Sequence, residues 1–377
     1  MLRSHFLIVT TVTITFAAAA ATFHGSLGST SSTANATTGT VVPATPMLAP
    51  RSGHTATLLP DGKILIAGGM RRNQDFYKSA EIFDPVTGKF QPTGEMSVGR
   101  VGHLAILLPS GRVLIAGGWI GHATTDSAEL YDPATGKFTV ISTMITRRAR
   151  PSATLLTNGN VLIAGGGDHD GADGAIASAE IFNSQTFQFQ PTGSLHRARL
   201  GQTATLLNNG TVLMAGGGGS AGLIARAELY DPTTGTFSET GNLNTPRHKH
   251  TAGLLPDGRV LIAGGSDERD WNGNLNSAEI YDPRTGKFSP AASLHDSRFK
   301  LPDEAVQLPS GKLLVAGGSK SVEIFDPLRG RFLLASGQMN DARHFMSETS
   351  LKDGRVLLAG GYPNNDQATD QAWIYRP

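Results

Sequence analysis

Three aspartates in one short segment have the spacing of metal ligands. Residues 168–174 read Asp-His-Asp-Gly-Ala-Asp-Gly, with carboxylates at positions one, three and six. Such a turn can place several oxygen ligands around Ca²⁺, although it lacks the downstream bidentate glutamate of an EF-hand loop. Asp168, Asp170 and Asp173 are therefore a candidate calcium site. The alternative is a solvated acidic turn without a metal.

A second set of residues combines aromatic rings and histidines with polar neighbours. An aromatic ring flanked by hydrogen-bonding groups suits a sugar ring or a side chain of a protein partner. The alternative is that these rings cover the bases of loops. The predicted ligand-binding set is Arg72, Tyr77, Trp119, His122, His248, His250, Trp271 and Tyr362.

The composition limits the chemistry. The chain contains no cysteine, which excludes disulfides, cysteine-ligated zinc, iron-sulfur clusters and a thiol nucleophile. The formal net charge is +1, whereas binding to nucleic acid by counterion release requires a basic surplus. Nucleic acid is therefore not an expected partner.

A repeat of about 48 residues must position these groups. Its clearest mark is a Gly-Gly pair, and successive pairs lie 43 to 53 residues apart. A turn dipeptide such as Asp61-Gly62 precedes each pair and predicts a hairpin. A third strand containing Glu-[Ile/Leu]-[Phe/Tyr] and a fourth containing Phe complete an antiparallel four-stranded unit. The pairs begin at Gly68, Gly117, Gly165, Gly216, Gly264, Gly317 and Gly360.

Charged residues also recur with the repeat. A basic residue stands seventeen positions before each pair: Arg51, Arg100, Arg148, Arg199, Arg247, Lys300 and Arg343. The third strands of six repeats begin with a glutamate: Glu81, Glu129, Glu180, Glu228, Glu279 and Glu323. An unpaired buried charge is too costly to be repeated seven times, so we expect structural ion pairs. The alternative is a positive ring that selects an anionic ligand.

The Gly-Gly pair and the two following aromatic positions resemble the kelch repeat, from Thr38 to Pro377. Kelch repeats form β-propellers, with one repeat per blade. The resemblance implies an all-β, seven-bladed kelch-type propeller within the galactose-oxidase-like propeller superfamily. Some kelch propellers are copper-radical oxidases with a tyrosine cross-linked to cysteine, which this chain lacks. A mutarotase-like or lyase-like enzyme acting on carbohydrate is the alternative to a binding module without catalysis.

The two ends of the chain predict how the ring closes. The last repeat holds one strand after its Gly-Gly pair and then stops. Residues 38–47 align with residues 87–96, sharing Thr, Gly, Pro and Met in register. An N-terminal strand therefore completes the last blade and removes an exposed sheet edge. The alternative is an open six-bladed arrangement with a frayed seventh repeat.

The N-terminal segment indicates export. Residues 1–21 combine Arg3, an apolar run and Ala19-x-Ala21, as in a signal peptide. Residues 22–37 are a Ser/Thr-rich linker, and residues 38–377 are the propeller. We expect the protein to be exported and to be periplasmic, secreted or located at the cell surface. We also expect a monomer without a membrane span in the mature chain. Its partner is a protein or a glycan, bound on the face with the variable loops.

Overall fold

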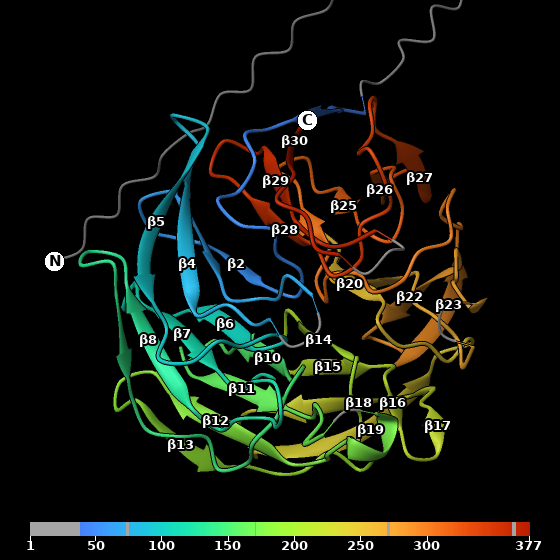
Figure 1. Cartoon of the computed structure of the whole chain (residues 1–377). Helices are drawn as coiled ribbons and strands as arrows, with labels where there is room; N and C mark the ends of the chain where they lie inside the picture. Colours follow the sequence, from blue (N-terminus) through green and yellow to red (C-terminus); the bar gives the residue numbers. More distant parts are fainter. Residues whose placement is uncertain (1–37, 73–74, 170, 270–271, 364–366) are drawn as a thin grey trace, which may run out of the picture. The chain divides into compact units, whose positions relative to one another are not determined.

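The computed structural model describes residues 38–377, except 73–74, 170, 270–271 and 364–366. The expected signal peptide and linker lie outside the described residues. Seven four-stranded antiparallel sheets follow one another along the unit Thr37–Pro377. The innermost strands of successive sheets contact each other in a closed circle, so the sheets are seven blades around one axis (Figure 1). Among the described residues, no helix is long and apolar enough to cross a membrane.

The strands of blades one to six run outward from the axis in chain order, and in blade seven β1 follows β28, β29 and β30 as the outermost strand. Blades one to four comprise β2 (Thr55–Leu58), β3 (Ile64–Ala67), β4 (Ser79–Asp84) and β5 (Lys89–Glu95); β6 (Leu104–Leu107), β7 (Val113–Ala116), β8 (Ala128–Asp132) and β9 (Lys137–Val140); β10 (Ser152–Leu155), β11 (Val161–Ala164), β12 (Ala179–Asn183) and β13 (Gln188–Pro191); and β14 (Thr203–Leu206), β15 (Val212–Ala215), β18 (Arg226–Asp231) and β19 (Thr236–Asn242).

The remaining elements complete the ring. Blades five to seven comprise β20 (Thr251–Leu254), β21 (Val260–Ala263), β22 (Ala278–Asp282) and β23 (Lys287–Ala291); β24 (Val306–Gln307), β25 (Leu313–Val315), β26 (Glu323–Asp326) and β27 (Arg331–Leu334); and β28 (Ser347–Ser350), β29 (Val356–Ala359), β30 (Ala372–Arg376) and β1 (Thr40–Pro43). A hairpin of β16 (Gly218–Gly219) and β17 (Gly222–Leu223), and the 3₁₀ helix η1 (Ala172–Gly174), lie in loops.

The core lies between neighbouring blades. The second strand of each blade is an apolar run that is buried at every position, as in β3 and β7, because a blade packs on both of its faces. One cluster joins Leu65 of blade one to Ile115 and Tyr131 of blade two. The repeated aromatic residues of the third and fourth strands pair within a blade, with Phe83 and Phe90 having ring centroids 4.9 Å apart.

The predicted ring closure is confirmed. Strand β1 pairs antiparallel with β30, and Val41 lies opposite Tyr375, just as Phe90 lies opposite Phe83 in blade one. Val41 is buried in the cluster that contains Trp373 and Tyr375. The N-terminal strand therefore supplies the outer strand of blade seven, and the open six-bladed alternative is wrong.

In each of the first six blades, a buried ion pair stabilises the segment that leads into the inner strand. The arginine that precedes the inner strand lies 2.6–3.1 Å from the repeated glutamate of the third strand. The second glutamate oxygen accepts the backbone N–H of the residue three positions before the arginine, as Glu180 does from Ile145. Nη1 of the arginine donates to the carbonyl of the first Gly of the pair, as Arg148 does to Gly165 at 2.9 Å. This arrangement, which we name the Arg–Glu clamp, confirms the structural role expected of the repeated charges.

The clamp also joins adjacent blades. The carbonyl of each clamp arginine, and that of Arg343, accepts the N–H of the second Gly in the preceding blade at 2.7–2.9 Å, with Gly361 donating to Arg51 to close the ring. The first Gly of the pair must be a glycine. At Gly117, with φ +66°, a Cβ would lie 2.5 Å from the carbonyl oxygen of Arg148.

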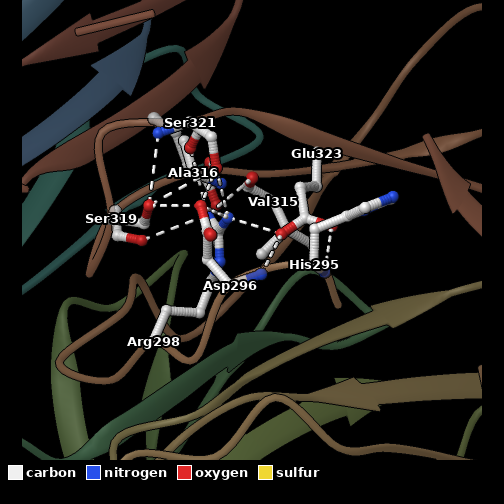
Figure 2. Close-up of polar contacts among 10 residues, drawn as sticks. His295, Asp296, Arg298, Val315, Ala316, Ser319, Ser321 and Glu323 are labelled. Carbon is white, nitrogen blue, oxygen red and sulfur yellow. Dashed lines mark hydrogen bonds and ion pairs between the residues drawn. The ribbon is translucent and has the colours of Figure 1, made fainter. Parts of the chain in front are cut away.

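Blades six and seven depart from the predicted clamp. In blade six the partner of Glu323 is Arg298, at 2.7 Å, so the expectation that Lys300 fills this position was wrong (Figure 2). Arg298 stands nineteen residues before Gly317. Blade six therefore contains two extra residues between its clamp arginine and its Gly-Gly pair, and counting back seventeen positions leads to Lys300 instead of Arg298. In blade seven Arg343 donates to the neutral Gln371 at 2.6 Å.

A chain that begins at Leu48 should melt several degrees below a chain that begins at Thr38. The shorter chain lacks β1, which exposes the outer edge of β30 and uncovers Trp373 and Tyr375. Thermal unfolding followed by circular dichroism measures the difference. Equal melting temperatures would show that β1 does not stabilise blade seven.

Glu180→Gln should lower the free energy of unfolding by about 3–5 kcal/mol, because it leaves the buried guanidinium of Arg148 without its counter-charge. Glu95→Gln is the control, since Glu95 and Lys78 form an exposed pair with side chains 52% and 59% accessible. Its cost should be below about 1 kcal/mol. Denaturant unfolding measures both, and equal losses would contradict the role assigned to the clamp.

Candidate functional site

A cavity of about 670 Å³ lies on the axis of the ring. Its wall combines the beginnings of the inner strands with loops that follow the Gly-Gly pairs of blades one to three. The loops contribute Met70, Phe76, Trp119 and His169. The expectation that these loops and the blade entrances share one face agrees with this lining. We name this hollow the axial cavity.

A circle of residues in left-handed conformation surrounds the axis. Each stands two positions after the clamp arginine or Arg343, with φ between 51° and 65°: Gly53, Gly102, Arg150, Gly201, Lys249, Lys300 and Phe345. Backbone hydrogen bonds link successive members across blade boundaries, as Gly102 donates to Gly53 and Arg150 to Gly102. Glycine adopts this conformation freely, whereas other residues pay about 1–3 kcal/mol and persist there mostly at functional sites. The four non-glycine members are therefore the ones that call for an explanation.

Arg150 lines the axial cavity and reaches from this circle to blade seven. Its guanidinium carbon lies 5.1 Å from the centroid of Phe345 in blade seven. Gly102 allows the Arg150 side chain to pass close to the backbone, because a Cβ at Gly102 would lie 3.0 Å from Cγ of Arg150. Arg150 is exposed to the cavity.

The opposite charge comes from blades six and seven. The two extra residues of blade six precede Ala305 and bring Asp303 and Glu304 to the cavity wall. Their side chains are accessible to solvent in the cavity, although protein surrounds the cavity itself. The surrounding protein desolvates both carboxyl groups. Desolvation raises the pKa of Asp303 to about 7, although the positive charge of Arg150 lowers it, and it also raises the pKa of Glu304. Asp303 can therefore exchange a proton near neutral pH.

Glu348 adds a third carboxyl group. The position twelve before the Gly-Gly pair is alanine in the first six blades and Glu348 in the seventh. Oε2 of Glu348 accepts the backbone N–H of Ala316 at 3.1 Å, and Oε1 is buried without a hydrogen-bond partner in the described part of the chain. Burial raises the pKa of Glu348 well above its usual range.

His250, expected in the ligand-binding set, lies between blades four and five. Its side chain is fully buried, and Nε2 lies 3.1 Å from the hydroxyl of Thr203. His54 and His103 make the equivalent contacts with Ser347 and Thr55 of their preceding blades. Burial lowers the pKa of His54 to about 3 and that of His250 well below its usual range. These rings are neutral links between blades.

The structure separates the other expected ligand-binding residues. Trp119 lines the axial cavity. Tyr77 covers the clamp, with the Arg51 guanidinium 4.7 Å from its ring centroid, and the buried Tyr362 accepts a hydrogen bond from Lys300 at 3.0 Å.

Four further members of the set lie outside this cavity wall or cannot be placed. Arg72 and His122 are exposed on loops, and the partly buried His248 pairs through its backbone with Ser266. Trp271 lies outside the described residues. The ligand-binding role of the full set stays a prediction.

The acidic turn is organised around a histidine. Asp168 Oδ1 lies 2.5 Å from Nδ1 of His169, and Asp173 Oδ2 lies 3.5 Å from its Nε2. Hydrogen bonds to Asp168 and Asp173 raise the pKa of His169. Asp170 lies outside the described residues, and among those described no group of three or more His, Asp or Glu is placed to hold a metal. Calcium binding here stays a prediction.

Comparison with known proteins identifies a known motif in part of the chain. A family model described as the kelch motif matches residues 50–97, 105–145 and 249–295, which contain strands of blades one, two and five. With seven four-stranded blades around one axis, the chain is a kelch-repeat β-propeller. No curated protein matches it.

One solved structure with a similar fold is that of a novel fungal alcohol oxidase with catalytic diversity among the AA5 family, in complex with copper. It has a TM-score of 0.72 and 17% sequence identity, and the match covers 90% of this chain and 76% of that chain. At this identity the likeness shows the fold alone, and it is consistent with the expected superfamily. The residues of this chain do not fit the cross-linked copper-radical centre of some kelch propellers, because the chain has no cysteine.

Asp303→Asn should change the pH dependence of stability. An acid whose pKa is raised on folding lowers stability as the pH rises from its unfolded value, about 3.9, to its folded value, about 7. The variant lacks this loss, so its melting temperature relative to wild type should rise between pH 4 and pH 8. A constant difference across this range would contradict the assignment, and ¹³C NMR titration of the carboxyl resonance that the variant lacks provides a direct check.

Proposed function

We propose that this protein is a binding module that takes a ligand into the axial cavity from the loop-bearing face, without catalysis. The observation that carries this proposal is the cavity itself. Its volume of about 670 Å³ falls within the range of about 300–1,000 Å³ typical of small-molecule sites. The proposal includes export, which the sequence of residues 1–21 supports, and a monomeric protein.

The wall chemistry favours carbohydrate over a protein side chain. Phe76 and Trp119 bring aromatic surface to the cavity from neighbouring loops, which meet where a Cβ on Gly121 would lie 3.4 Å from the Phe76 ring. Aromatic faces pack against the apolar face of a sugar ring, and the carboxyl groups of Asp303 and Glu304 can bind its hydroxyls. A protein partner that inserts one side chain is the other ligand consistent with this wall.

One observation favours a second candidate, an enzyme that acts on carbohydrate. A carboxyl group that titrates near pH 7 inside a cavity is suited to general acid-base catalysis, and Asp303 meets this description. An enzyme of this class would convert a bound sugar at a rate that Asp303→Asn abolishes. A binding module would retain the sugar unchanged, which NMR of the recovered ligand distinguishes.

Trp119→Ala should weaken ligand binding at least about tenfold, because it removes aromatic surface from the cavity wall. A glycan array and extracts of cell surfaces identify the ligand, and titration calorimetry measures the affinity. Val86→Ala is the control, since Val86 is 92% accessible in an outer turn, and it should leave the affinity unchanged. Unchanged affinity of Trp119→Ala, with an unchanged circular dichroism spectrum, would place the site elsewhere.

A further inference from the structure

Several residues of the axial cavity that depart from the repeat are charged. Arg150 and Lys249 stand where three other blades have glycine in the left-handed conformation. Glu348 replaces a repeated alanine, and Asp303 and Glu304 accompany a two-residue insertion. None of these side chains belongs to an Arg–Glu clamp. Glu348 also accepts a hydrogen bond from Ala316 of blade six, so Arg150, Asp303 and Glu304 are the ones whose position on the axis calls for a role other than holding the blades together.

Arg150 is the most informative of them. Within the described residues its guanidinium forms no ion pair, and its ring contact is with Phe345. An aromatic ring beside a guanidinium restricts its orientation while its N–H groups remain available in the plane. Such a group binds a planar carboxylate through two parallel hydrogen bonds.

Within the described residues, no nearby carboxyl group forms an ion pair with Arg150. Burial raises the pKa values of Asp303, Glu304 and Glu348, and a protonated carboxyl group donates as well as accepts hydrogen bonds. The wall of the cavity thus combines a cation, polar groups suited to hydroxyls, and aromatic surface from Phe76 and Trp119. A cavity of this size encloses a small ring better than a peptide chain.

We propose that Arg150 is the specificity-determining residue of the axial cavity and that its ligand is a sugar bearing a carboxylate group. This inference rests on the proposed function and adds the chemical class of the ligand. Arg150 holds the carboxylate, while the sugar ring lies deeper against the aromatic and carboxyl-bearing walls.

The test uses Arg150→Gly, which introduces the residue found at Gly53, Gly102 and Gly201. Because glycine suits the left-handed backbone, the variant should melt at the same temperature as wild type or higher. Arg150→Lys is a second variant, which keeps the charge and loses the planar fork. The probes are D-galacturonate, its uncharged methyl ester and D-galactose, measured by titration calorimetry on the full chain.

Wild type should bind galacturonate at least about tenfold more tightly than the methyl ester, and Arg150→Gly should abolish that difference. Arg150→Lys should retain part of it. Equal binding of acid and ester to wild type, or an unchanged preference in Arg150→Gly, would overturn the inference. If the inference about Arg150 fails but Trp119→Ala still weakens the binding of all three sugars, the proposed function is retained. Binding of an acidic peptide in place of any sugar would overturn the ligand class, and absence of any ligand dependent on Trp119 would overturn both proposals.

Discussion

The buried Arg–Glu clamp is the interaction on which the rest of this propeller depends. Each clamp connects the segment that enters a blade, the Gly-Gly turn and the third strand, and the arginine carbonyl binds the preceding blade. Burial lowers the pKa of Arg148, and the charge and hydrogen bond of Glu180 oppose that shift. A charge held in this way tolerates little displacement, since loss of its partner leaves it uncompensated. The beginning of each inner strand is therefore fixed in relation to two blades at once.

This constraint brings sequence-distant positions together at the axis. The residue two places after the arginine takes the same left-handed conformation in every blade, including Arg298-x-Lys300 in blade six. A regular scaffold of this kind can carry an irregular centre, because the clamps do not use the side chains that face the axis. Arg150, Asp303 and Glu348 differ from one another while the backbone that carries them repeats.

The fold could be predicted from the sequence because each of its signals is local or periodic. Turn dipeptides mark the hairpins, apolar runs mark the buried strands, and the match of residues 38–47 with 87–96 identifies the closing strand. The pairing of Arg148 with Glu180 followed from the cost of repeated buried charge. Lys300 was misassigned because a fixed spacing was counted through a two-residue insertion. The Met or Leu that stands four residues before each clamp arginine would have aligned Arg298 with the others.

The candidate site was harder to predict, because its members meet only after the ring closes. Arg150 and Phe345 are almost two hundred residues apart in the chain, yet they are in contact at the wall of the cavity. Aromatic residues and histidines were predicted to bind a ligand because of their residue types. However, Tyr77 covers a clamp arginine, and His250 connects two blades. Replacement of a repeated residue was the more useful signal: glycine by Arg150 and alanine by Glu348.

That contrast separates two kinds of polar residue in the propeller. Residues that repeat with the blades, such as the clamp arginines and glutamates, satisfy each other and are needed wherever a blade begins. The charged residues at the axis do not repeat, and Arg150 stands in a backbone conformation that glycine would adopt with less strain. A side chain kept against its backbone preference, outside the clamp and facing a cavity, is better explained by what enters the cavity than by the stability of the ring.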